Sequence, residues 1–143
     1  MSFTNLSAPS AALRVCVDHA EGGHLSGLVY SQRLTEPLPF TDVGNLLLRL
    51  DEVLDTQNFP QAFQRTRSFT GRKEAVPAAA GPEEGMPAET VAQAHGLFYT
   101  FEISVTSRRN ASWQGLVDWL DGEARQEFSS ALELIKLIET RVL

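Results

Sequence analysis

The chain has 143 residues, of which 43% are hydrophobic and 21% are charged; these values are typical of a folded globular domain and exclude a disordered chain. Its 12 basic and 18 acidic side chains give a formal net charge of −6. This acidic balance argues against nonspecific binding to nucleic acid or to an anionic membrane. The single cysteine, Cys16, cannot form an internal disulfide, which is typical of proteins from a reducing compartment.

The first twelve residues are small and polar and predict a loose tail. They lack the basic stretch and apolar run of a signal peptide. No apolar segment approaches the ~18–20 residues that a membrane-spanning helix needs. We therefore expect a cytoplasmic protein with no membrane partner.

The first structured region, residues 13–54, predicts two strands and a helix. Residues 13–18 alternate between apolar and polar, and residues 25–30 form a second strand after the turn signal Gly22-Gly23. A proline-containing loop then leads to Asp42, a residue type that caps helices. The following helix carries one apolar stripe, made of Val43, Leu46, Leu47, Leu50, Val53 and Leu54.

The last region, residues 101–142, predicts the same order of elements. Residues 101–106 alternate, a polar turn follows, and residues 113–119 form the next strand. Ser130 and Glu133 have the spacing of a capping box at the start of the final helix. The apolar stripe of that helix consists of Ala131, Leu134, Ile135, Ile138 and Val142.

The two regions align without a gap at an offset of 88 residues, with six identities over the 42 positions of 13–54. We predict one α+β domain, residues 1–143, built as a tandem ββα-ββα repeat with units 13–54 and 101–142. In this fold four strands form an antiparallel sheet with both helices on one face. The alternative is that two ββα segments look alike because the same physics shapes both.

Gly27 and Gly115 occupy equivalent places in the two units, on the inward phase of their strands. Glycine inside a strand marks a bulge or the close approach of another backbone. We expect each glycine to make room for the helix of its own unit.

An insertion, residues 55–96, separates the two units. Residues 74–90 are rich in Ala, Pro, Gly and Glu, a composition that predicts a flexible linker. The preceding stretch is basic and aromatic, a combination found in protein interfaces and in sites for single-stranded nucleic acid; in the alternative, its phenylalanines cover one end of the core and its arginines face water. The candidate binding residues are Phe59, Phe63, Arg65, Arg67, Phe69, Arg72 and Lys73.

No catalytic motif is recognisable in the chain. His19 and His24 flank the first hairpin turn near Asp18 and Glu21, but their spacing matches no zinc motif. The sequence contains no nucleophile elbow, phosphate-binding loop or dinucleotide fingerprint. We therefore expect no enzymatic activity, no catalytic residues, no metal and no cofactor.

Residues 110–115, Asn-Ala-Ser-Trp-Gln-Gly, resemble the Asn/Asp-x-Ser-x-x-Gly element of PilZ domains. The resemblance implies cyclic di-GMP binding. An Arg-x-x-x-Arg pair that grips the nucleotide in that family has no counterpart in this chain. The alternative reading is a cyclic-dinucleotide or nucleic-acid binding domain with its site at Arg108, Arg109, Asn110, Ser112 and Gly115.

The strand at 113–119, with the pattern Trp-Gln-Gly-x-Val-x-Trp, and the Phe-Ser-Ser-Ala-Leu-Glu-Leu segment at 128–134 resemble parts of small bacterial proteins of unknown function. The resemblance implies no activity. The sequence favours a non-enzymatic binding or regulatory module. Its expected partner is another protein or a second copy of the chain, bound through residues 59–73 of the insertion.

Overall fold

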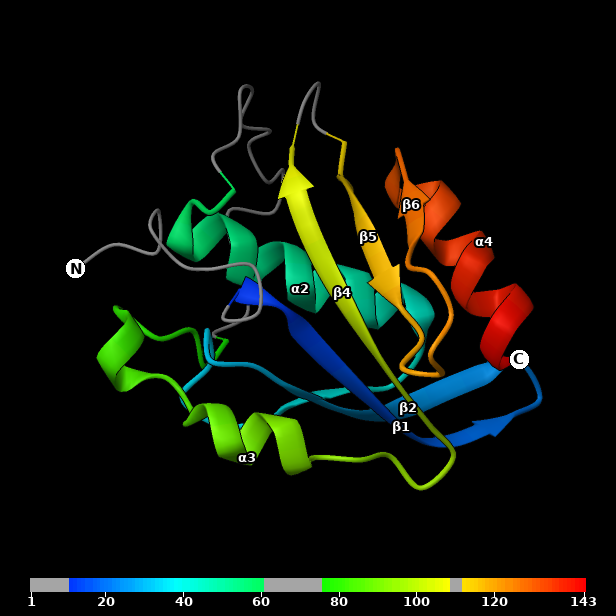
Figure 1. Ribbon diagram of the computed structural model, residues 1–143, viewed down its shortest axis with the longest axis horizontal. Helices are drawn as coiled ribbons and strands as arrows, with labels where there is room; N and C mark the ends of the chain where they lie inside the picture. Colours follow the sequence, from blue (N-terminus) through cyan, green and yellow to red (C-terminus); the bar gives the residue numbers. More distant parts are fainter. Residues whose placement is uncertain (1–10, 61–75, 109–111) are drawn as a thin grey trace.

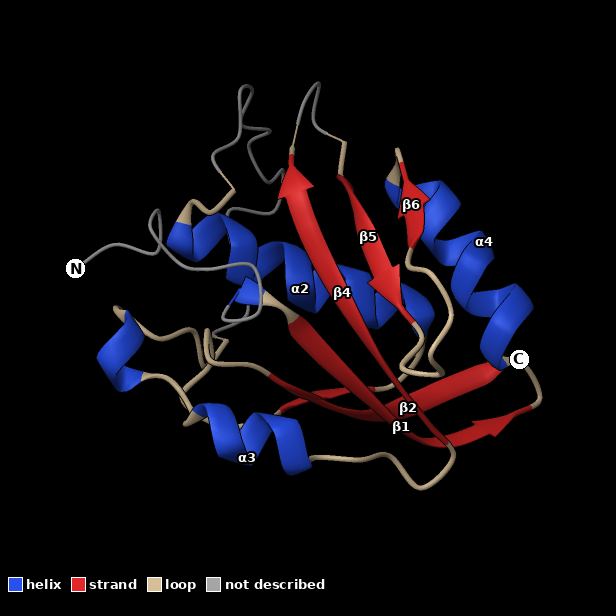
Figure 2. Ribbon diagram, in the orientation of Figure 1, coloured by secondary structure: helices blue, strands red, loops and turns tan. Residues whose placement is uncertain are grey.

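The computed structural model describes residues 11–60, 76–108 and 112–143. In these ranges six strands form one antiparallel sheet, in the order β3-β2-β1-β4-β5-β6, accompanied by three α-helices (Figures 1 and 2). The strands are β1 (Leu13–Glu21), β2 (His24–Tyr30), β3 (Leu38–Phe40), β4 (Tyr99–Ser107), β5 (Gln114–Asp118) and β6 (Gln126–Phe128). The α-helices are α2 (Val43–Gln57), α3 (Ala88–Gln93) and α4 (Ala131–Val142), and one turn of 3-10 helix, η2, spans Pro82–Glu84.

The predicted α+β class and antiparallel sheet are confirmed, but the described sheet has six strands where we expected four. The two additional strands, β3 and β6, lie at the edges and have three residues each. Three residues are too few to show an alternating pattern, and Pro39 within β3 reads as a loop residue. A proline is compatible with an edge strand because its missing N–H is not needed on the outer side.

Both long helices begin at the predicted caps. The Asp42 carboxylate accepts a hydrogen bond from the Asn45 backbone N–H at 2.7 Å, and the Ser130 hydroxyl accepts one from the Glu133 N–H at 3.0 Å. Each cap satisfies a backbone donor that has no partner within the helix. Helix α2 ends at Asn58, whose φ of 48° is the left-handed conformation common at helix C-termini.

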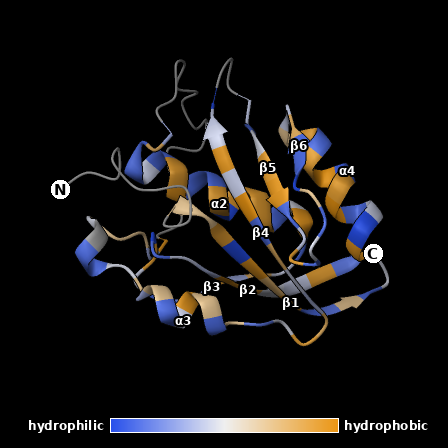
Figure 3. Cartoon of the chain, in the orientation of Figure 1, coloured by the Kyte–Doolittle hydropathy of each residue, from blue (hydrophilic) through white to orange (hydrophobic). Residues whose placement is uncertain are grey.

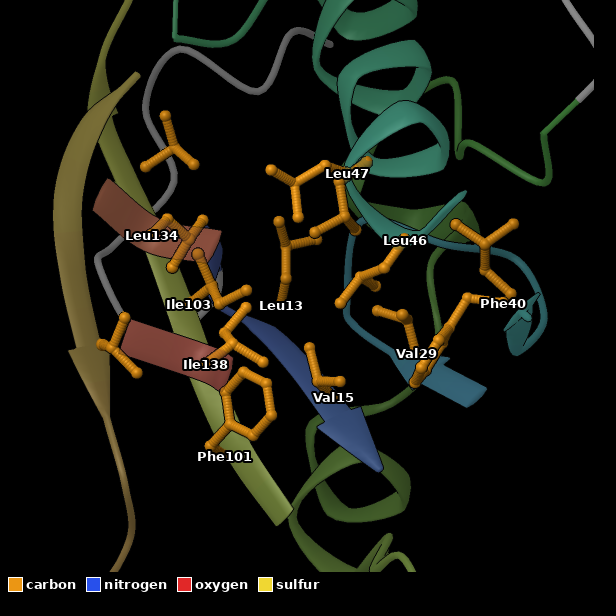
Figure 4. Close-up of a cluster of buried hydrophobic side chains, with 14 of the residues drawn as sticks. Leu13, Val15, Val29, Phe40, Leu46, Leu47, Phe101, Ile103, Leu134 and Ile138 are labelled. Carbon is orange, nitrogen blue, oxygen red and sulfur yellow. The ribbon is translucent and has the colours of Figure 1, made fainter. Parts of the chain in front are cut away.

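Alternating residues of the strands meet the apolar stripes of α2 and α4 in one hydrophobic core (Figure 4). Hydrophobic residues concentrate in the strands and in these helices, while most loops are hydrophilic (Figure 3). Within the described ranges, no helix is both long enough and apolar enough to cross a bilayer. The labelled core side chains are Leu13, Val15, Val29, Phe40, Leu46, Leu47, Phe101, Ile103, Leu134 and Ile138.

The two strand glycines are required by the neighbouring strand, and not by a helix as we expected. A Cβ atom at Gly27 would lie 2.0 Å from the Cys16 carbonyl oxygen, and one at Gly115 would lie 2.0 Å from the Ser104 oxygen. The strand pairing shifts register next to both glycines, between Val17 and His19 in β1 and at the corresponding place in β4. These shifts bring the backbones too close for any side chain.

Part of the stretch that we predicted to be a flexible linker, residues 74–90, packs against the domain. Leu34 and Ala78 form a β-bridge, and the Met86 N–H donates to the Leu34 carbonyl at 2.8 Å. Met86 and Val91 are buried in the core. The composition did not predict this packing, because the partners come from the loop between β2 and β3.

Candidate functional site

The base of the insertion, where the chain leaves α2, is held by a buried arginine. Arg33, in the loop after β2, is 1% exposed. Its Nε donates to the Gln57 side-chain oxygen at 2.8 Å, and its Nη2 donates to the carbonyl of Phe59. The guanidinium also lies over the Phe59 ring, 5.2 Å from the centroid, a distance at which a cation and an aromatic face attract.

Arg33 and Gln57 also hold the chain where it returns to the domain after residue 75. The Gln57 side-chain amide donates to the carbonyls of Arg33 at 2.8 Å and Ala79 at 3.0 Å. The Ala79 N–H donates to the Arg33 carbonyl at 2.9 Å, and the Thr35 N–H donates to the Pro77 carbonyl at 2.8 Å. The entry and the exit of residues 61–75 are therefore fixed to one small network.

A second buried arginine, at the end of β4, also secures the entry. Arg108, directly after β4, donates from Nε to the Pro60 carbonyl at 2.7 Å and from Nη2 to the Leu54 carbonyl at 3.3 Å. Its Nη1 forms an ion pair with Asp55 at 2.6 Å. We call Arg33, Gln57 and Arg108 the clasp, because together they hold both ends of the insertion segment 61–75.

The clasp concentrates positive charge at the base of the insertion. Burial, together with the charge of Arg108, lowers the pKa of Arg33 to about 10, so the guanidinium remains protonated at neutral pH. Among the described residues, Asp55 is the one carboxylate that forms an ion pair with either arginine. Burying two cations beside the one carboxylate that the described residues supply is costly, and hydrogen bonds to backbone carbonyls offset this cost.

The predicted binding residues lie on the segment that the clasp holds. Phe59 is half-buried beneath Arg33 and belongs to the base itself. The remaining six lie outside the described residues: Phe63, Arg65, Arg67, Phe69, Arg72 and Lys73.

The residues of the alternative nucleotide site have mainly structural contacts where they are described. All three guanidinium nitrogens of Arg108 bond to the base of the insertion. Gly115 pairs with Val105 and Phe128 across the sheet, and Ser112 is half-buried. Arg109 and Asn110 lie outside the described residues.

The other chemically reactive side chains among the described residues do not form a common site. In the described ranges no group of three or more His, Cys, Asp or Glu side chains has the geometry of a metal site. Cys16 is buried, and this burial raises the pKa of its thiol to about 11, so that the neutral form dominates. Next to it, Arg14 pairs with Glu102 at 2.9 Å and donates to the Ala94 carbonyl at 2.7 Å, which ties the segment after α3 to the sheet.

The sequence predicted a binding segment at residues 59–73 but did not predict the clasp. Arg33 and Gln57 are 24 residues apart, and Arg108 lies 53 residues from Asp55. A lone arginine in a polar loop reads as a solvent-facing residue. Arg33 stands in the sequence Ser-Gln-Arg-Leu, directly after an apolar strand, but this pattern does not distinguish a buried arginine from an exposed one.

Comparison with known proteins adds no assignment. No family model matches the chain. No curated protein and no solved structure is significantly similar to it.

Proposed function

We propose that this chain is a non-enzymatic binding module that engages another protein through residues 59–73 of its insertion. The observation that carries the proposal is the clasp. The side chains of Arg33, Gln57 and Arg108 donate seven hydrogen bonds, five of them from buried guanidinium groups. Three of the seven reach the entry and the exit of the segment directly, at the carbonyls of Phe59, Pro60 and Ala79. The other four tie Arg33 to Gln57 and Arg108 to the end of α2.

Such an anchored base favours binding. Binding residues are concentrated on loops that a rigid scaffold positions. Fixing the two ends of a segment in advance reduces the conformational entropy that binding must remove. A loop that only connected two units would not need two buried arginines at its base.

The composition of the segment favours an acidic protein surface as the partner. Residues 65–73 contain four cations, Arg65, Arg67, Arg72 and Lys73, and no carboxylate. Arginine and aromatic residues contribute disproportionately to binding energy at protein interfaces. A local positive charge on a chain of net charge −6 orients an approaching acidic partner.

The proposal is tested with a triple variant, Arg65→Ala, Arg67→Ala and Arg72→Ala. Tagged wild-type protein and the variant are used to capture partners from cells that carry the protein, and captured proteins are then purified and titrated. We expect the variant to lose at least about tenfold in affinity for a partner that wild type captures, or about 1.4 kcal/mol.

A control variant with two exposed or half-exposed cations removed elsewhere, Arg49→Ala and Lys136→Ala, should keep the affinity of wild type. Both variants should unfold at temperatures near that of wild type. Equal affinity of the triple variant and wild type for every captured protein would contradict the proposal.

We further propose that the scaffold arose by tandem duplication, with α2 and α4 covering one face of the sheet about a pseudo-twofold axis. Three correspondences at the 88-residue offset support this. They are the helix caps Asp42 and Ser130, the edge strands β3 and β6, and the register shifts beside Gly27 and Gly115.

The pairing of the two central strands adds a fourth argument. In the register of β1 and β4, Arg14 lies opposite Glu102. Glu102 is also the residue that corresponds to Arg14 at the offset of 88. Leu13 lies opposite Ile103 and Val15 opposite Phe101, so the pattern is symmetric about this pair. In a twofold interface, a residue on the axis faces its own counterpart in the other unit, and the residues on either side pair reciprocally, as they do here. In a crystal structure, residues 13–54 and 101–142 should superpose with the same strand order and helix side; a different helix side would contradict duplication.

A further inference from the structure

The end of the sheet opposite the clasp exposes apolar side chains. Leu97 is 84% exposed and Phe98 is 54% exposed, in the loop that leads into β4, where Figure 3 shows a hydrophobic stretch. Leu120, after β5, is 41% exposed. Tyr99 and Trp119, their neighbours in the chain, have ring centroids 6.3 Å apart, which brings the three exposed side chains to the same end of the sheet.

The backbone at Leu120 is an additional unusual feature of this end. Its φ is 58°, in the left-handed region that a bulky residue adopts at a cost of roughly 1–2 kcal/mol. Its N–H donates to the Asp118 carboxylate at 2.9 Å, which holds the turn. Leu120 lies outside the hydrophobic core that the described residues form.

Acidic side chains surround these apolar residues. Asp18 accepts the Leu97 N–H at 3.0 Å. Asp121 and Glu123 pair with Arg141, the latter at 3.7 Å, and Asp118 pairs with Arg125 at 3.5 Å. Four carboxylates and two guanidinium groups leave this end negative. We call it the acidic end; it consists of Leu97, Phe98, Leu120, Asp18, Asp118, Asp121 and Glu123.

We infer that the acidic end binds the basic insertion segment, residues 61–75, of a second copy of this chain, in a head-to-tail contact. This inference rests on the proposed function and identifies the protein partner as a second copy of the chain. The segment supplies four cations at 65–73, together with Phe63 and Phe69 as apolar anchors. The acidic end supplies exposed apolar side chains and four carboxylates, three of which already pair with Arg125 or Arg141, so that it keeps an excess of negative charge. This excess charge and the apolar side chains are complementary to the segment.

The base of the segment and the acidic end lie far apart in the same molecule. Arg108 contacts Pro60 directly after β4, whereas Phe98 directly precedes β4, and the ends of β4 lie at opposite ends of the molecule (Figure 1). Nine strand residues span about 30 Å. This separation favours a contact between molecules over a contact within one chain, and the dependence of association on protein concentration distinguishes the two.

A head-to-tail contact uses two different surfaces, so it does not close into a dimer by itself and produces chains whose length rises with concentration. Sedimentation velocity of the full chain at low ionic strength should show this growth. Because screening weakens attraction between exposed charges, high salt should shift the distribution towards the monomer.

Two variants make the test specific to head-to-tail geometry. The variant Leu97→Lys/Phe98→Lys loses the acidic end but keeps the segment, whereas Arg65→Glu/Arg67→Glu/Arg72→Glu loses the segment but keeps the acidic end. Each variant alone should be monomeric. An equimolar mixture should form a 1:1 dimer that does not grow, because each partner contributes its one intact surface.

A control variant, Leu48→Lys/Leu132→Lys, makes the same chemical change at exposed sites on α2 and α4 and should associate like wild type. Monomeric wild type at every concentration, or a mixture that stays monomeric, would overturn the inference. The two proposals can fail separately. If the mixture stays monomeric, a second copy of the chain is excluded as the partner. If the Arg→Ala triple variant nevertheless binds a captured protein more weakly than wild type does, the proposed function stands.

Discussion

The clasp makes a direct prediction about stability through Arg108. Replacing Arg108 with Met keeps much of the side-chain volume but removes the three nitrogens that bond to Pro60, Asp55 and Leu54. The change leaves two carbonyls and one carboxylate without this partner. Breaking a buried ion pair costs roughly 3–5 kcal/mol. Because the Asp55 side chain is 24% exposed, we expect a value near the lower limit, about 3 kcal/mol.

The contribution of the ion pair is separated by a double-mutant cycle with Asp55→Asn. We expect a coupling energy of about 1.5 kcal/mol between positions 55 and 108, typical of a hydrogen bond to a charged group. Urea denaturation followed by the fluorescence of Trp113 and Trp119 measures all four proteins, and equal denaturant slopes validate the comparison. The exposed pair Arg125–Asp118, 3.5 Å apart, provides the control: Arg125→Met should cost under about 0.5 kcal/mol.

A cost below about 1 kcal/mol for Arg108→Met, at an unchanged denaturant slope, would refute the reasoning. It would mean that water replaces the guanidinium without penalty. The site would then be accessible to solvent, and Arg108 would not anchor the base of the insertion.

Three further predictions concern the scaffold. Gly115→Ala should destabilise the protein by at least about 3 kcal/mol, because the new Cβ would lie 2.0 Å from the Ser104 oxygen, whereas Gly44→Ala, in the first turn of α2, should be neutral or stabilising; equal melting temperatures would contradict the steric argument. Replacing residues 76–90 with a Gly/Ser linker should lower the melting temperature by roughly 5–10 °C through the loss of Met86, and an unchanged value would indicate a dispensable linker. Cys16 should resist thiol reagents in the native state, and its raised pKa should make the protein less stable as the pH rises from about 9 to about 11, because the unfolded chain releases the thiol proton first; a Cys16→Ala variant should lose this part of the pH dependence.

Local patterns in the sequence predicted the hairpins and helices. The alternation of residues 13–18, the turn at Gly22-Gly23 and the cap at Asp42 each depend on neighbours in the chain, and each is present in the structure. The edge strand β3 was missed because three residues carry no period. Its hydrogen bonds to β2 come from tertiary context, which single-sequence patterns do not contain.

The candidate site was only partly predictable for the same reason. The basic and aromatic composition of the insertion is visible along the sequence, but the residues that hold its base are not. Arg33 and Arg108 look like surface residues until the fold brings them to Phe59, Pro60 and Asp55. Likewise, Met86 packs only because its backbone bonds to Leu34, so composition alone indicated a linker.

The central claim is that residues 59–73 form the contact with a protein partner. Photocrosslinking in cells tests it most directly, with a photoreactive amino acid at position 67 and, in a second protein, at the exposed position 136 on α4. We expect the protein labelled at position 67 to yield a discrete covalent adduct with another chain, and the protein labelled at position 136 to yield much less of it. No adduct at position 67, or the same adduct at both positions in equal amount, would contradict the account.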